Sequence, residues 1–326
     1  MKKTFFDSSP DVIKKFLGYL QTVKGKSIKT VEEYFLDLRT FFRYMKLKNN
    51  LVSPDSEFDK IEIDDIDIEF IRKISLLDIF EYMNYLSSER GNHAAARLRK
   101  TSSLRMFFKY LTNKTGELKV NPTKELETPK LGKRLPKFLS LEQSQELLRA
   151  VMNYPGKYRE RDYCIITLFL NCGIRLSELV GINLNDIKPD GTLKILGKGN
   201  KERIVYLNDA CVQAIERYKK ERPNDGVKDA NAFFISRQHN RISVKTVQFL
   251  VEKYLKVAGL SDSGFSVHKL RHTAATLMYQ YGNVDIRILK EILGHENLGT
   301  TEIYTHISNN QLKEAIKDNP LNKVCT

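Results

Sequence analysis

The chain is organised around residues 293–306, which read LGHENLGTTEIYTH. This stretch places the imidazole of His295 nine positions before the phenol of Tyr304, with glycines at its front and Gly-Thr-Thr in between. A turn there lets both polar groups point the same way, which makes Tyr304 a candidate nucleophile. Because the chain has 15 tyrosines, the assignment depends on finding a target for this phenol elsewhere in the sequence.

The net charge of the chain indicates the class of partner that would supply such a target. The chain has 326 residues, with 54 Lys and Arg against 40 Asp and Glu, and its formal charge at pH 7 is +14. This excess favours a polyanionic partner, although many basic proteins bind no nucleic acid. The length allows two domains, and a hydrophobic content of 41% predicts a chain that is folded throughout.

Neither secretion nor membrane insertion is predicted. An acid, Asp7, stands where a signal peptide needs a long apolar stretch, and no apolar run reaches membrane-spanning length. We therefore expect a cytoplasmic protein. Four cysteines without CxxC pairing predict neither a disulfide framework nor a zinc knuckle, and we expect reduced, structural thiols. They are Cys164, Cys172, Cys211 and Cys325.

The first 120 residues have the pattern of a helical domain. Apolar residues recur at spacings of three and four between 11 and 44, which predicts two amphipathic helices joined across 24–27. Further helices are predicted over 77–86 and 94–111. All of these helices precede the best linker in the chain.

Two features of this first half need an interpretation. The octapeptide 104–111 echoes 38–45, and we interpret both as core-facing helix ends with aromatic anchors rather than as a duplication. Residues 55–69 hold eight acids against one lysine. They are most simply a solvated loop or helix that DNA would repel, or else a patch between subunits.

The predicted linker spans residues 121–137, where three prolines keep the chain extended. Its cations suit it to run along a phosphate backbone, although a flexible solvated linker would have the same composition. These cations include Lys130, Lys133 and Arg134.

The second half is predicted to be mostly helical with a small sheet. Ser140 and Gln143 form a capping signature at a helix start, and the almost wholly apolar run 163–170 predicts a buried helix. The β-rich runs 192–196 and 202–207 bracket a glycine-containing turn and predict a hairpin.

The first basic cluster is CGIRLSEL at 172–179. A helix that opens at Gly173 offers free N–H groups and aims Arg175 at an anion, while Glu178 lies on the same helical face and can steer a neighbouring group. A surface Arg-Glu pair is the alternative.

The second cluster is the hairpin tip, which carries Lys198, Lys201 and Arg203. Flanking glycines allow a close approach to a phosphate backbone, and an ammonium there can deliver a proton to a leaving oxygen. Charged hairpin tips without such a role are also common.

The third cluster is VHKLRH at 267–272, at the start of a helix. The spacing lets His268 and Arg271 face one ligand, with the guanidinium on two phosphate oxygens and the imidazole exchanging a proton. His268 and His272 are also spaced like a zinc pair, but Lys269 stands where a metalloprotease has its glutamate, so no metal site is predicted.

These clusters, in chain order, resemble the signature of the tyrosine recombinase, or phage integrase, family. The matching motifs are G-[IL]-R-x-S-E-L, G-K-G-x-K-x-R, H-x-L-R-H, L-G-H and Y-T-H, and all five are present. The resemblance covers nearly the whole chain and is greatest to the Xer-type branch.

The resemblance implies a role for each polar group. Tyr304 would attack a scissile DNA phosphate and form a 3′-phosphotyrosyl link, which frees a 5′-hydroxyl. Arg175 and Arg271 would clamp the non-bridging oxygens, and Lys198 would protonate the leaving oxygen.

The same resemblance implies that His268 assists deprotonation of the tyrosine, that His295 hydrogen-bonds the phosphate, and that Glu178 supports the cluster from behind. A phenol has a pKa near ~10, so nearby guanidiniums favour the phenolate. The phosphotyrosine bond stores the energy of the cut, and religation therefore needs no ATP, metal or other cofactor.

The implied fold is mainly α and forms a C-shaped clamp around the duplex. A helical, SAM-like core-binding domain would cover residues 1–120, a linker 121–137, and a mostly α catalytic domain with a small sheet 138–326. Basic helices such as 96–109 would lie against DNA. The expected DNA contacts are Arg105, Lys130, Lys133, Arg134, Lys201 and Arg203.

The expected partner is a double-stranded recombination site bound by a homo-tetramer, with or without a second related recombinase. A short helix at 310–316 would dock into a neighbouring protomer or fold back on its own domain. The biological role is either chromosome-dimer resolution or integration and excision of a mobile element. The alternative function is a catalytically silent protein of the same fold that binds or bridges DNA.

Overall fold

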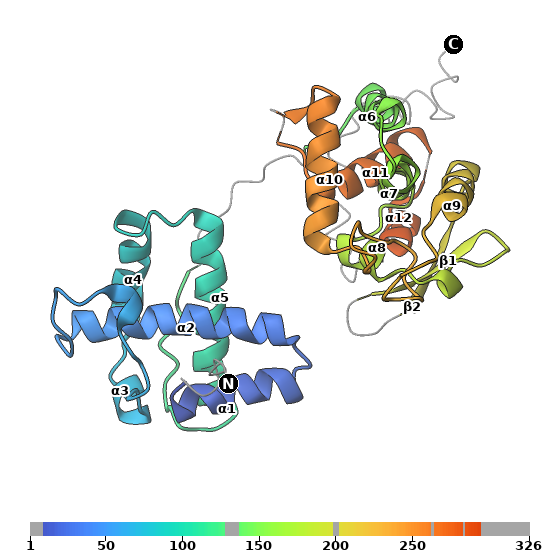
Figure 1. Ribbon diagram of the computed structural model, residues 1–326. Helices are drawn as coiled ribbons and strands as arrows, with labels where there is room; N and C mark the ends of the chain where they lie inside the picture. The colour runs from blue at the N-terminus through green and yellow to red at the C-terminus, as the bar shows by residue number, and fades with distance from the viewer. Residues whose placement is uncertain (1–8, 128–136, 198–201, 262–263, 283, 295–326) are drawn as a thin grey trace, which may run out of the picture. The chain divides into compact units, whose positions relative to one another are not determined.

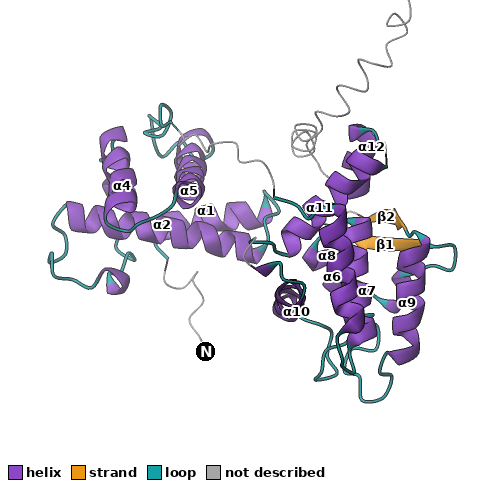
Figure 2. Ribbon diagram, turned by 90° about the horizontal axis from the view of Figure 1, so that it is seen from above, coloured by secondary structure: helices purple, strands orange, loops and turns teal. Residues whose placement is uncertain are grey.

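The computed structural model describes residues 9–127, 137–197, 202–261, 264–282 and 284–294. The chain divides into two compact units, Met1–Lys133 and Arg134–Thr326 (Figure 1). Helices dominate both units, and the strands in the described ranges form one two-stranded sheet (Figure 2). The prediction of a mainly α fold with a small sheet is therefore confirmed.

The N-terminal unit is helical, as its apolar spacing predicted. Ser27 caps its second helix by accepting a hydrogen bond from the backbone of Thr30, and Ser75 with Asp78 forms a capping box at the fourth. The elements are α1 (Asp11–Thr22), α2 (Ile28–Lys48), the 3-10 turn η1 (Phe58–Lys60), α3 (Ile68–Arg72), α4 (Leu76–Ser88) and α5 (Ala94–Asn113).

Aromatic side chains fill the core where α2 packs against α5. The rings of Phe42 and Phe107 lie 5.9 Å apart, and those of Phe41 and Phe108 lie 6.3 Å apart, both edge to face. All four side chains are fully buried. The two echoing octapeptides are thus the core-facing segments of their helices.

The acidic segment 55–69 is more than a solvated loop, which corrects the expectation from its charge. Its acids alternate with apolar residues, so the backbone can turn one set inward while the carboxylates stay outside. Lys46 on α2 pairs with Asp65 over 2.8 Å, and Arg43 donates to the Ile61 carbonyl over 2.8 Å. Three isoleucines of the segment are buried: Ile61, Ile63 and Ile66.

The C-terminal unit is built around α7, which contacts α6, α9 and α11 (Figure 1). The predicted capping box at Ser140 and Gln143 is present, and α7 is buried over most of its length. The elements are α6 (Leu141–Asn153), α7 (Arg159–Cys172), α8 (Leu176–Gly181), the 3-10 turn η2 (Leu184–Asp186), β1 (Thr192–Leu196), β2 (Glu202–Tyr206), α9 (Asp209–Glu221), α10 (Val244–Val257), α11 (Val267–Tyr281) and α12 (Ile286–Leu293).

The two strands form the predicted antiparallel hairpin. In its register Ile195 stands opposite Arg203, and Leu193 stands opposite Val205. Because side chains alternate along a strand, these four residues share one face, and on it Leu193, Ile195 and Val205 belong to the core. The register therefore turns Arg203 toward the inside of the unit.

The described cysteines are buried free thiols, as the sequence predicted. Cys164, Cys172 and Cys211 form no disulfide, although the sulfurs of Cys172 and Cys211 lie 3.6 Å apart. Cys325 lies outside the described residues.

Candidate active site

Gly173 ends α7 and does not open the next helix, which corrects the expectation from its position. Its φ is +58°, and its N–H donates to the Phe169 carbonyl over 3.2 Å. The following helix, α8, begins at Leu176 with Arg175 as its N-cap residue. The positive φ of Gly173 favours glycine, and a Cβ here would lie 2.9 Å from Cδ2 of Leu293, so that side chain of α12 would have to shift.

Glu178 is the buried centre of the site, with a side chain that is 2% exposed. It accepts hydrogen bonds from the backbone N and Nη1 of Arg175, over 2.7 and 2.8 Å, and from Nη1 and Nη2 of Arg203, over 2.7 and 2.9 Å. Burial raises the pKa of Glu178, but the hydrogen bonds and charges of Arg203 and Arg175 outweigh it and hold the pKa at about 2. The carboxylate is therefore ionised at neutral pH.

Arg175 and Arg271 converge on the C-terminal end of α12. Nη2 of Arg175 donates to the carbonyl of Gly294 over 2.8 Å, and Nη2 of Arg271 donates to that of Leu293 over 2.5 Å. Nη1 of Arg271 also donates to the carbonyl of Gly173 over 2.6 Å. Carbonyls at a helix C-terminus lack partners within the helix and carry partial negative charge, so they suit two guanidiniums.

His268 lies on the first turn of α11, one turn before His272. The two rings meet edge to face with centroids 4.5 Å apart. Desolvation, followed by the charges of Arg271 and Arg175, lowers the pKa of His268. Desolvation, followed by the charges of His268, Arg271 and Lys269, lowers the pKa of His272 to about 4. Both imidazoles are therefore neutral at pH 7, the form that can accept a proton.

The structure thus brings together Arg175, Glu178, His268 and Arg271. Four further predicted groups of the site lie outside the described residues: Lys198, Lys201, His295 and Tyr304. The same holds for the linker cations Lys130, Lys133 and Arg134 and for the predicted helix 310–316. Arg105 is described, and it is half-buried on α5 of the other unit.

The structure gives two sets of predicted DNA-facing cations other partners. Arg203 has a side chain that is only 16% exposed, and it pairs with Glu178. On α5, Arg99 and Lys100 pair with the buried carboxylate of Asp37, over 2.7 and 3.1 Å. Part of the positive charge expected to face DNA is therefore paired with carboxylates of the protein itself.

Arg241, which was not singled out from the sequence, forms hydrogen bonds with backbone carbonyls at the end of α8. Its Nη1 donates to the carbonyls of Val180 and Ile182 over 3.0 and 3.1 Å, and its Nε pairs with Asp229 over 2.8 Å. An isolated arginine in a loop carries no motif, so no signal in the sequence could have found it.

A metal site and a membrane span are both unsupported in the part of the chain that the structure describes. No three His, Cys, Asp or Glu side chains gather there in a way that could hold a metal ion. No helix in the same ranges is long and apolar enough to cross a membrane.

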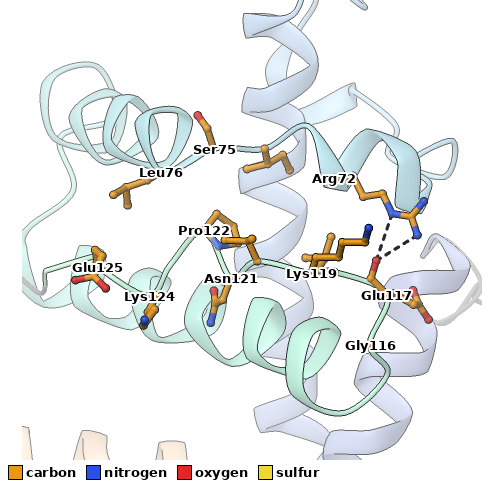
Figure 3. Close-up of a pocket in the computed structure, with 13 residues that line it drawn as sticks. Arg72, Ser75, Leu76, Gly116, Glu117, Lys119, Asn121, Pro122, Lys124 and Glu125 are labelled. Carbon is orange, nitrogen blue, oxygen red and sulfur yellow. Dashed lines mark hydrogen bonds between the residues drawn. The ribbon is translucent and has the colours of Figure 1, made fainter.

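A cavity of about 780 Å³ lies within the N-terminal unit (Figure 3). Its wall includes Arg72, whose Nε and Nη2 each donate to the carbonyl of Glu117 over 3.3 Å. Its lining includes both cations and acids, with Lys119 near Glu117 and Lys124 near Glu125. It therefore offers no concentrated charge for a phosphate.

The sequence also matches a known family. Residues 137–311 match the sequence model of the phage integrase family. The chain belongs to the phage integrase family. These proteins are tyrosine recombinases, as the motifs predicted. A relative among them, tyrosine recombinase XerC of Caldanaerobacter subterraneus subsp. tengcongensis, is 52% identical over 314 residues, which are 96% of this chain and 88% of the relative.

Solved structures of tyrosine recombinases share the fold. The XerH recombinase, in a post-cleavage complex with a palindromic difH substrate, matches with a TM-score of 0.70 and 21% identity, over 94% of this chain and 84% of that one. The Tn1549 transposon integrase, in complex with transposon right-end DNA, matches with a TM-score of 0.71 and 17% identity, over 94% and 98%. At these identities the likeness concerns the fold alone.

Proposed function

We propose that this tyrosine recombinase cleaves and rejoins DNA at a specific site through a 3′-phosphotyrosyl link to Tyr304. The observation that carries the proposal is the convergence of Arg175 and Arg271 beside a neutral His268, above the buried carboxylate of Glu178. Two fixed guanidiniums next to a proton acceptor form a site prepared for a phosphate whose negative charge grows during attack.

In the proposed reaction the phenolic oxygen of Tyr304 forms a bond to phosphorus, and the bond from phosphorus to the 5′-oxygen breaks. His268 takes the phenolic proton, and Lys198 gives a proton to the leaving 5′-oxygen. Attack by the 5′-hydroxyl of another strand reverses these steps and releases the tyrosine. One phosphodiester replaces another, so the cycle consumes no cofactor.

The proposed substrate is duplex DNA, and the proposed assembly is a tetramer. The exchange of two duplexes cuts four strands, and each subunit offers one nucleophile, so four subunits are needed. The solved structures of the XerH and Tn1549 neighbours contain DNA. Whether the tetramer holds one recombinase or two related ones depends on the cognate site, as does the choice between chromosome-dimer resolution and movement of a mobile element.

A catalytically silent DNA-binding protein is not favoured. Silent relatives of an enzyme lose the groups that act on the substrate, whereas Arg175, His268 and Arg271 are present here and brought together.

The proposal is tested with a nicked suicide duplex whose sequence is taken from the chromosomal DNA that flanks the gene. The 5′-hydroxyl product diffuses away after cleavage, so a covalent complex accumulates and migrates slowly in a denaturing gel. We expect this complex from the wild type in the presence of EDTA. A wild-type protein that binds the duplex tightly but never forms the complex would overturn the proposal.

A further inference from the structure

Arg203 lies at a junction of three segments of the C-terminal unit. It belongs to β2, where the register turns it inward opposite Ile195. Its guanidinium forms a two-point pair with Glu178 on α8, and its side chain also borders Gly294, the residue that ends α12. A planar fork that meets a carboxylate at two points fixes both direction and distance.

The contact with Gly294 is close. A Cβ on Gly294, whose φ is +63°, would lie 3.1 Å from Cδ, 3.3 Å from Nε and 3.5 Å from Cζ of Arg203. The Nε atom is buried and has no hydrogen-bond partner among the described residues. The side chain of Arg203 therefore packs against the end of α12, where a Cβ on Gly294 would press on it.

The contacts of Arg203 close a ring. Arg203 holds Glu178, Glu178 holds the backbone N and Nη1 of Arg175, and Nη2 of Arg175 holds the carbonyl of Gly294, against which Arg203 packs. The ring joins three segments that lead to groups of the proposed active site. They are β2, which follows the turn of Lys198, the N-cap of α8 at Arg175, and the end of α12 just before His295.

We propose that Arg203 is a positioning residue that fixes Arg175 and the end of α12 in place relative to the hairpin. This inference rests on the proposed function and deepens it. In this role Arg203 acts through Glu178, which both of its Nη atoms meet, and its side chain is only 16% exposed. This role differs from the expectation that Arg203 contacts the DNA backbone directly.

The two roles predict different outcomes for DNA binding. A residue that contacts a phosphate contributes to affinity for every duplex, and its loss reduces the salt slope of binding by about one. A positioning residue leaves affinity and slope unchanged and lowers the rate of the chemical step. The measurement therefore compares the dissociation constant at several salt concentrations with the single-turnover rate of covalent complex formation.

The variants are Arg203→Gln, which removes the charge and the fork, and Arg203→Lys, which keeps the charge alone. The matched control is Arg149→Gln on α6, because Arg149 is 60% exposed and pairs with Glu146 at the surface. We expect Arg203→Gln to form the complex at least about 100-fold more slowly, with a dissociation constant within about twofold of the wild type. Arg203→Lys recovers part of the rate, and Arg149→Gln matches the wild type.

Hydrogen–deuterium exchange without DNA tests the positioning independently of activity. In Arg203→Gln we expect faster exchange in peptides over 174–180 and 286–294, with α6 and α9 unchanged, and no such effect in Arg149→Gln. Unchanged exchange at both segments, or weaker binding with a reduced salt slope and an unchanged rate, would overturn the inference. A wild type without a covalent complex would contradict the proposed function, while the exchange result would still decide the role of Arg203.

Discussion

Arg175 and Arg271 bind neighbouring peptide carbonyls, because Nη2 of Arg175 lies 2.8 Å from the oxygen of Gly294 and Nη2 of Arg271 lies 2.5 Å from that of Leu293. These hydrogen bonds fix the direction of each guanidinium. Most of the cost of orienting two cations is thus met when the chain folds, before DNA binds. Such preorganisation is the main source of electrostatic catalysis.

Replacement of Arg271 tests this relationship. Arg271→Lys keeps a positive charge but cannot reach the carbonyls of Gly173 and Leu293 together. We expect the single-turnover rate of covalent complex formation to fall by about 10²–10³-fold, while the affinity for duplex DNA changes only a few-fold. The measurement is a quenched time course on the suicide duplex with protein in excess. If the affinity of Arg271→Lys for duplex DNA fell as much as its rate of covalent complex formation, the prediction would be wrong.

Replacement of Gly173 is predicted to destabilise the protein for two separable reasons. An alanine there is strained because φ is +58°, and its Cβ would also meet Cδ2 of Leu293 at 2.9 Å. Gly259 provides the control, because its φ is +71° and its Cβ would meet nothing within 4 Å. Calorimetry should show Gly259→Ala destabilised by about 1–2 kcal/mol and Gly173→Ala by clearly more. Equal losses of stability in the two variants would contradict this prediction, because they would mean that Leu293 and α12 make room for the Cβ without destabilising the protein.

Glu178 should make the C-terminal unit sensitive to acid. The pKa in the folded state is about 2, below the ordinary value of 4.5. A lowered carboxyl pKa contributes stability that is fully present above the unfolded pKa and is lost as the pH falls through the folded one. The contribution is at most about 3 kcal/mol, and it is lost between about pH 4.5 and about pH 2.

The matching measurement is calorimetry of the wild type and Glu178→Gln at pH 6 and pH 3. We expect Glu178→Gln to have a lower free energy of unfolding than the wild type at pH 6, and this difference in free energy to be smaller at pH 3. A difference that stays constant with pH would show that the carboxyl group titrates normally.

The two histidines of α11 should stay neutral through the physiological range. Desolvation and then neighbouring charges lower both pKa values, and that of His272 falls to about 4. In an NMR titration of the imidazole signals, we expect His272 to take up its proton near pH 4 and His268 below its usual value of 6.5. Removing one nearby charge, in Arg271→Gln, should raise both midpoints. Midpoints at or above 6.5 in the wild type would contradict the assignment of His268 as a proton acceptor.

The helices and the chemistry were readable from the sequence because both are local signals. The spacing of Phe35, Leu38 and Phe42 predicted a helix face, and Ser140 with Gln143 predicted a cap that the structure contains. The pairing of Glu178 with Arg203 was not readable, since it spans 25 residues and depends on the register of the hairpin. Gly173 was misread as a helix start, although a glycine directly after an apolar helix is also the common sign of a helix end, which is the role it has in the structure.

The proposed reaction attaches the phenolic oxygen of Tyr304 to DNA. The most direct measurement is protease digestion of the trapped complex, followed by mass spectrometry of the nucleotide-bearing peptide, with the cut strand labelled at either end. We expect a single modified residue, Tyr304, joined to the 3′ side of the break, and no complex from Tyr304→Phe. Attachment to another of the 15 tyrosines, or to a 5′ end, would contradict it.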